Sequence, residues 1–210
     1  MSGTKDSLQS LIHLLRANVT DPSSRGTAFT ETITGTAGTL AYTTTNKGIQ
    51  YLSVTVDSVA KVFGKNYTVD LGTASSGATI TFATAPGLGA TIVVTGKKTT
   101  SWVYSEFSRN AVTYPIISVK LGAGEMKRKG LGDISVSQYW LDGSYDVVIH
   151  SKSPKERDEI AHSIMSVIQQ NPAYSKFIKT EVSAISVAPY DNGSQLYRCN
   201  ISVKGLWDEK

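Results

Sequence analysis

The stretch Tyr145–Asn171, YDVVIHSKSPKERDEIAHSIMSVIQQN, decides the fold because it joins a strand to a clearly bounded amphipathic helix. The Ser153 hydroxyl can accept a hydrogen bond from the backbone N–H of Glu156, and the Glu156 carboxylate can reach back to the Ser153 N–H. Pro154 suits the first helical position, and a proline directly after Asn171 predicts the helix end. The stretch therefore predicts one helix with a defined start and stop.

The predicted helix carries one apolar stripe, so it needs a sheet to pack against. The stripe consists of Ile160, Ala161, Ile164, Met165 and Ile168. Apolar runs and alternation of apolar with polar residues indicate strands on both sides of the helix in the sequence. The expected strands are Tyr114–Leu121, Ile134–Trp140, Tyr145–His150, Val182–Val187 and Gln195–Leu206.

The segments between these strands contain turn signals. Gly122–Asp133 is expected to form a glycine-punctuated loop, and Asp142-Gly143 is expected to form a hairpin turn. A second hairpin turn is expected at Tyr190–Ser194. Trp102–Asn110 is expected to be a short helix or an irregular link.

The N-terminal segment predicts a further helix over residues 5 to 19. Leu8, Leu11, Ile12 and Leu15 recur at helical spacing, whereas Arg16 falls on another face. The polar face is poor in lysine and arginine, so packing on a sheet is favoured over binding to a membrane surface.

Between residues 27 and 100 the composition changes to threonine, glycine, alanine and valine. Short strands bounded by turn residues predict a small antiparallel sandwich or barrel in this block. The predicted fold is α+β: a core of residues 1–26 and 101–210, with a mixed or antiparallel sheet packed by two helices, and an inserted small all-β sandwich-like domain of residues 27–100. The strands expected in the insert are Thr30–Ile33, Ile49–Val56, Tyr67–Leu71, Thr79–Ala83 and Thr91–Thr95.

The composition is that of a folded protein. Of the 210 residues 40% are hydrophobic, and the net charge of +4 is weak evidence for nucleic-acid binding because basic and acidic residues are mixed. We expect a soluble protein in a reducing cytoplasm, since the N-terminal residues lack a signal-peptide pattern and no apolar window approaches about 18 residues. Cys199 is either a small buried apolar group or a reactive thiol.

The sequence contains no catalytic or metal-binding pattern. His13, His150 and His162 show no metal-ligand spacing, and the glycines after residue 121 do not follow a dinucleotide-binding pattern. A G-x-S-x-G motif is absent, although a Ser–His–Asp set assembled in three dimensions stays open. We therefore expect a protein that is not an enzyme and uses neither cofactor nor metal.

The second half of the β-rich block resembles β-rich modules that recur in bacteriophage virion proteins. The similarity rests on Tyr67-Thr68-Val69-Asp70 and on the phrase Ile80–Val94, ITFATAPGLGATIVV. This resemblance implies a virion surface module.

The order of elements outside the block resembles that of the tail terminator proteins of long-tailed bacteriophages. The similarity rests on the helix Ser7–Val19, the strand Tyr114–Val119, the strand–helix unit Tyr145–Gln169 and the closing strand that ends at Trp207. It implies a non-enzymatic subunit of a hexameric ring, with copies of itself, a tail tube protein and a head–tail connector or neck protein as partners. The ring caps the finished tube in the virion tail or neck, after assembly in the host cytoplasm, and no membrane is involved.

Carboxylates at the start of the long helix are candidates for a ring interface. Glu156, Asp158 and Glu159 lie where negative charge favours the positive end of the helix, and Arg157 sits among them. They form an ordinary solvated face, an acid/base pair, or a surface that meets basic residues of a neighbouring subunit.

A basic group is the second candidate for the ring interface or lumen. It consists of Lys127, Arg128 and Lys129, with Glu125 nearby. It is either a solvated loop or, repeated around a ring, a positive pore lining that makes non-specific contact with passing DNA.

Two other functions stay open from the sequence. The first is a neck or head-completion protein of the same virion region. The second is a carbohydrate- or receptor-binding adaptor that acts through the β insert, although Tyr51, Tyr67 and Trp102 do not form a recognisable sugar-binding pattern.

Overall fold

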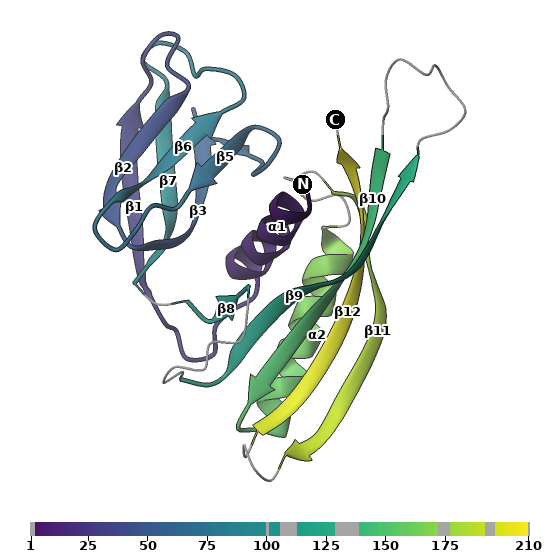
Figure 1. Cartoon of the computed structure of the whole chain (residues 1–210). Coiled ribbons are helices and arrows are strands. Elements are labelled where there is room, and N and C mark those ends of the chain that lie inside the picture. The colour runs from purple at the N-terminus through teal and green to yellow at the C-terminus, as the bar shows by residue number, and fades with distance from the viewer. Residues whose placement is uncertain are drawn as a thin grey trace. The chain divides into compact units, whose positions relative to one another are not determined.

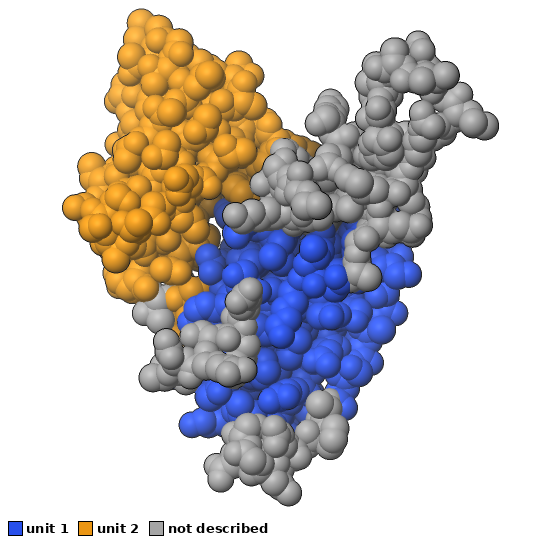
Figure 2. Space-filling view, in the orientation of Figure 1, with its two compact units in different colours: residues 1–23, 102–210 blue, residues 24–101 orange. Residues whose placement is uncertain are grey.

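The computed structural model describes residues 3–99, 101–105, 113–128, 139–171, 177–191 and 196–209. The chain divides into two compact units, coloured separately in Figure 2. Unit 1 comprises residues 1–23 and 102–210, and unit 2 comprises residues 24–101.

Unit 1 has an α+β fold with two helices and a five-stranded sheet (Figure 1). Its elements are α1 (Gly3–Asn18), β8 (Val103–Tyr104), β9 (Ile116–Arg128), β10 (Tyr139–Ser151), α2 (Pro154–Gln170), β11 (Phe177–Asp191) and β12 (Leu196–Glu209). The strand order is β11-β12-β10-β9-β8. All neighbours are antiparallel except β8 and β9, so the sheet is mixed.

Both helices pack on the same face of this sheet. α1 lies against β8, β9 and β10, and α2 lies against β10, β11 and β12. Val147 stands directly opposite Val119 and Ile201, so the three side chains share a face and are fully buried beneath the helices. The predicted stripe of α2 is confirmed, with Ile160, Ala161, Ile164 and Ile168 buried and Met165 packed against the same core.

Polar contacts fix α1 to the sheet near both of its ends. The Tyr145 hydroxyl donates to Ser7 Oγ at 2.6 Å, and both residues are buried. In the last turn, Arg16 Nε and Nη2 donate to the Val103 carbonyl at 3.0 and 2.7 Å. Burial lowers the pKa of Arg16 to about 10, partly opposed by Tyr104, so the guanidinium stays charged at neutral pH. Arg16 thus ties the end of α1 to the strand where unit 1 resumes.

The region between β9 and β10 differs from the expectation. Gly122–Arg128 continues β9 instead of forming a loop, and Asp142-Gly143 lies inside β10 instead of forming a hairpin turn. Gly143 pairs with Gly124 on one side and with Gly205 on the other, and this pairing on both sides overrides the turn preference of Asp-Gly. Residues 129–138, which include the rest of the expected loop and most of an expected strand, lie outside the described residues.

A bulge explains how the glycines of β9 fit a strand. The pairing passes from Gly143 opposite Gly124 to Tyr145 opposite Leu121, so two residues of β9 lie opposite one residue of β10. A Cβ atom on Gly122 would lie 2.7 Å from Ser144 Oγ. A side chain at position 122 would therefore require the Ser144 hydroxyl to move, and glycine avoids this crowding.

Unit 2 contains two antiparallel sheets around one core. Its strands are β1 (Thr27–Thr34), β2 (Ala41–Lys47), β3 (Ile49–Val56), β4 (Val59–Lys61), β5 (Tyr67–Asp70), β6 (Gly77–Phe82) and β7 (Thr91–Lys98). The orders are β1-β7-β3-β4 and β2-β6-β5. Leu52 and Val94 of the first sheet share a buried cluster with Tyr42 and Ile80 of the second. The five expected strands are confirmed in position, whereas β2 and β4 were not expected.

A carboxylate also joins the two sheets of unit 2. Glu31 on β1 accepts hydrogen bonds from the backbone N–H groups of Thr45 and Asn46 on β2, at 2.7 and 3.2 Å. The Lys98 ammonium on β7 donates to Asn46 Oδ1 at 2.8 Å. These contacts hold one end of β2 against the other sheet.

No helix in the described part of the chain is long and apolar enough to cross a membrane.

We expect Tyr145→Phe to lower the free energy of unfolding by about 1–2 kcal/mol, because it removes a buried hydrogen bond while keeping the ring. Ser7→Ala should cost a similar amount. The double variant should cost less than the sum of the two, since both changes remove the same bond. Denaturant unfolding measures these differences, and strictly additive losses would contradict the assigned contact.

Candidate functional site

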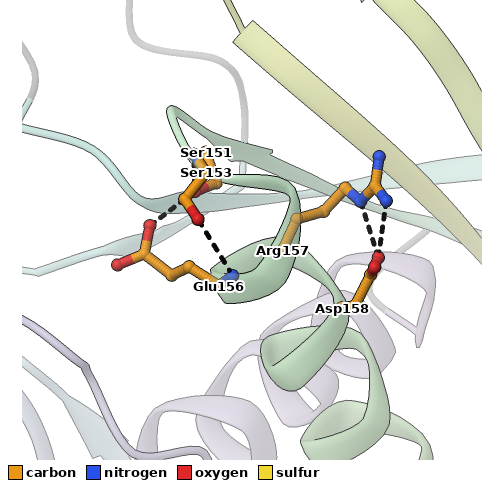
Figure 3. A network of polar contacts seen from close by, with 5 residues as sticks. All are labelled: Ser151, Ser153, Glu156, Arg157 and Asp158. Atoms are coloured by element: carbon orange, nitrogen blue, oxygen red, sulfur yellow. Dashed lines mark hydrogen bonds and ion pairs between the residues drawn. The ribbon is translucent and has the colours of Figure 1, made fainter.

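The start of α2 is held by a short relay of polar contacts (Figure 3). Ser153 Oγ accepts from the Glu156 N–H at 3.4 Å, which confirms Ser153 as the N-cap. The Ser153 N–H donates to Ser151 Oγ at 3.0 Å, and Ser151 Oγ donates to the Glu156 carboxylate at 2.5 Å. The expected direct bond from the Ser153 N–H to Glu156 is therefore wrong, because the Ser151 hydroxyl lies between them.

Arg157 is buried rather than solvated. Only 8% of the residue is exposed, and the Nε and Nη2 atoms each lie 2.7 Å from Asp158 Oδ1. Its guanidinium carbon lies 5.9 Å from the centre of the Tyr197 ring, within the range of a cation–π contact. The interpretation of the whole segment as a solvated face is wrong for Arg157, which packs inward and uses Asp158 as its partner.

Cys199 lies in the core beside this arginine. The residue is 1% exposed, and burial raises the pKa of its thiol, with Arg157 acting in the opposite direction. The interpretation as a small buried apolar group is confirmed.

Each carboxylate of the acidic group has a partner within the chain. Glu156 accepts from Ser151, Asp158 binds Arg157, and Glu159 lies 3.8 Å from Lys155 one turn earlier. The Asp158 and Glu159 side chains are nevertheless 60% and 67% exposed. These two carboxylates can therefore meet another surface, whereas Glu156 belongs to the helix cap.

The basic group lies at the other end of β10 from the start of α2. The backbone of Glu125 stands opposite Asp142, and Ser151 lies nine positions after Asp142 in β10. At a rise of about 3.3 Å per residue, this is a distance of about 30 Å. The structure thus does not bring the acidic and basic groups together within one chain. Lys127 and Arg128 also lie in β9, but their side chains, that of Glu125 and all of Lys129 lie outside the described residues.

His150 lies at the end of β10, on the face of the sheet opposite the helices. It stands between Ile116 and Arg198, and only 5% of the residue is exposed. Burial, together with the positive charges of Arg198 and Lys120, lowers the pKa of His150 to about 4. The imidazole is therefore neutral at pH 7.

Within the described ranges, no three His, Cys, Asp or Glu side chains gather in a way that could hold a metal ion. Of the aromatic residues considered for sugar stacking, Tyr67 is 2% and Trp102 is 6% exposed, whereas Tyr51 is only partly buried. Unit 2 has a shallow pocket of about 340 Å³. Its lining residues are Val56, Lys61, Lys65, Asn66, Phe82, Ala83, Thr84, Ala85, Pro86 and Gly87.

No protein-family model and no curated protein matches this chain.

We expect Ser153→Ala to lower the free energy of unfolding by about 1 kcal/mol, because it removes the helix cap. Ser151→Ala should cost a comparable amount, since Ser151 joins the Ser153 N–H to Glu156. Ser163→Ala, in the middle of α2, is the matched control and should be neutral or slightly stabilising. Thermal and denaturant unfolding compare the three variants, and an unchanged Ser151→Ala protein would contradict the relay.

We also expect stability to fall as the pH is lowered from about 6.5 to about 4. In this range the unfolded chain protonates His150, whereas the folded protein keeps it neutral. The total loss from this group should be about 1–3 kcal/mol. His150→Gln should flatten this part of the profile in denaturant unfolding at several pH values. Parallel profiles for the two proteins would contradict the assignment.

Proposed function

We propose that the protein is a virion structural protein of a long-tailed bacteriophage, a ring subunit that caps the tail tube and joins it to the head connector. The supporting observation is that unit 1 is a complete α+β fold in the order α1, β8, β9, β10, α2, β11, β12. The helix before unit 2 packs on strands that follow it. The resemblance to tail terminator proteins rests on four parts of this order: α1, β9, the unit β10–α2 and the closing strands.

We further propose that residues 24–101 are an inserted, sandwich-like β domain. The chain leaves unit 1 after Ser23 and returns at Trp102, and the contact of Arg16 with Val103 ties the two connection points together. The two sheets of unit 2 share their own core, which favours independent folding. In the proposed ring this domain projects outward, because an insertion at a subunit seam would block closure.

In the proposed ring, the two charged groups act between neighbouring subunits or at the lumen. They lie at opposite ends of β10, so they can meet only through a second copy. The exposed carboxylates of Asp158 and Glu159 are available for this contact. If the basic residues of β9 do not contact a neighbouring subunit, they would line the lumen. Repeated positive charge there favours non-specific contact with DNA.

The two alternative functions differ in their support. The fold of unit 1 suits a neck or head-completion protein equally well. Such a protein differs from a terminator in its binding partner. A sugar-binding adaptor receives less support, because the burial of Tyr67 and Trp102 leaves neither ring available for stacking.

We expect the purified protein to limit the growth of tail tubes. Added to polymerising tube protein, it should give shorter tubes that carry one ring at one end in electron micrographs. A neck protein would instead leave the tube length unchanged and bind the connector. Unchanged tubes and no ring, in the presence of both partners, would refute the proposed class.

A variant in which a short glycine–serine linker replaces residues 24–101 is the matched test of the insert. We expect it to keep a folded unit 1 and to cap tubes like the full chain. If it folds but no longer caps, the β domain is part of the binding surface.

A further inference from the structure

The exposed large apolar side chains in the described part of unit 1 all lie on two strands. Leu121 of β9 is 39% exposed, and Ile185 and Val187 of β11 are 49% and 56% exposed. These strands lie toward opposite sides of the sheet, with β10 and β12 between them. The apolar surface of unit 1 is therefore concentrated at two sheet margins.

The three side chains also share one face of the sheet. Leu121 stands opposite Tyr145, and Ile185 stands opposite Ile201. Val187 stands opposite Cys199, and all three of these partners belong to the core beneath the helices. Residues directly opposite each other in antiparallel strands point to the same face. Leu121, Ile185 and Val187 thus extend the apolar face of the core beyond the area that the helices cover.

Both margins offer backbone for further pairing. β11 is the terminal strand of the sheet, and its register is regular from Ala184 to Ala188. On the other side, β8 pairs only with Ile117 and Ser118 of β9. Among the described strands none pairs with β9 from Val119 to Arg128 on that side. An unpaired strand edge is a template for another strand.

The directions of the two edges match. Three antiparallel steps lead from β11 through β12 and β10 to β9, so β11 and β9 run in opposite directions. A second copy placed beside the first in the same orientation brings its β9 antiparallel to β11. The strand directions would then keep alternating from one copy to the next. Leu121 of one copy would lie near Ile185 and Val187 of the other, on the same face of the sheet.

We propose that β11 of one copy pairs with β9 of the next copy, so that neighbouring subunits share one continuous sheet. The contact joins two different surfaces of the chain and is therefore heterologous, which gives a ring when the rotation closes. This inference deepens the proposed function and rests on it for the closed ring. The pairing itself joins the two apolar margins and covers the side chains that the helices leave exposed.

Two single variants test the pairing by blocking one edge each. Leu121→Lys places a charge at the β9 edge, and Val187→Lys places a charge at the β11 edge, where pairing would bury it. We expect the wild-type chain to form a closed oligomer, and each variant alone to be limited to monomers, in size-exclusion chromatography with light scattering. An equal mixture should form a dimer, because the intact β11 of Leu121→Lys can pair with the intact β9 of Val187→Lys.

The matched control is Leu88→Lys in unit 2, where an apolar side chain is 81% exposed. It should assemble like the wild-type chain, and circular dichroism should give the same spectrum for all four proteins. A Leu121→Lys protein that still dimerises alone would overturn the proposal in favour of symmetric β11 pairing. A monomeric wild-type chain, or normal assembly of both edge variants, would also overturn it.

The outcomes separate this inference from the proposed function. Rings that depend on both edges but leave tail tubes unchanged would support the pairing and refute tube capping. Tube capping by both edge variants as efficiently as by the wild-type chain would support the function and refute the pairing.

Discussion

The structure depends on contacts within unit 1 that join the segment before unit 2 in the sequence to the segment after it. α1 precedes the β-rich unit, yet its apolar residues share a core with strands and a helix that follow that unit. The bond from Tyr145 to Ser7 spans 138 residues, and the bond from Arg16 to Val103 spans 87. Such contacts carry a large loop-closure cost, which a folded unit 2 reduces by holding its own ends together. These polar pairs then fix the position of α1, because a shift of the helix would break both contacts.

β10 is the central strand of unit 1 and explains the largest difference between sequence and structure. It pairs along its length with both β9 and β12, so its backbone groups are committed on two sides. The local preference of Asp142-Gly143 for a turn is small compared with these ladder contacts. The same pairing draws Gly122–Arg128 into β9, with a bulge at Gly122 and Ala123. Local signals therefore mislead where two neighbouring strands impose an extended backbone.

Sequence patterns predicted the parts of the fold in which local and tertiary preferences agree. The helix of Pro154–Gln170 has a cap, a stripe and a stop, and each signal proved correct except the Glu156 contact. β4 was missed because its two-residue turn uses Asp57 and Ser58 at positive φ instead of an asparagine–glycine pair. The burial of Arg157 was also missed. An arginine among carboxylates indicates a solvated face, whereas the structure places its guanidinium near the Tyr197 ring of β12.

The candidate site could not be predicted from the sequence, because the positions of its residues depend on strand register. From the sequence, the acidic and basic groups are merely two charged segments, and Leu121, Ile185 and Val187 are ordinary strand residues. The pairing of β9 with β10 places the two charged groups about 30 Å apart, which excludes contact within one chain. The same register directs the three apolar side chains to the helix-covered face at opposite margins. A monomer gains nothing from apolar side chains in this position, since they add exposed surface next to unpaired backbone. A head-to-tail neighbour would use both strand edges, because it brings opposite margins of the sheet into contact.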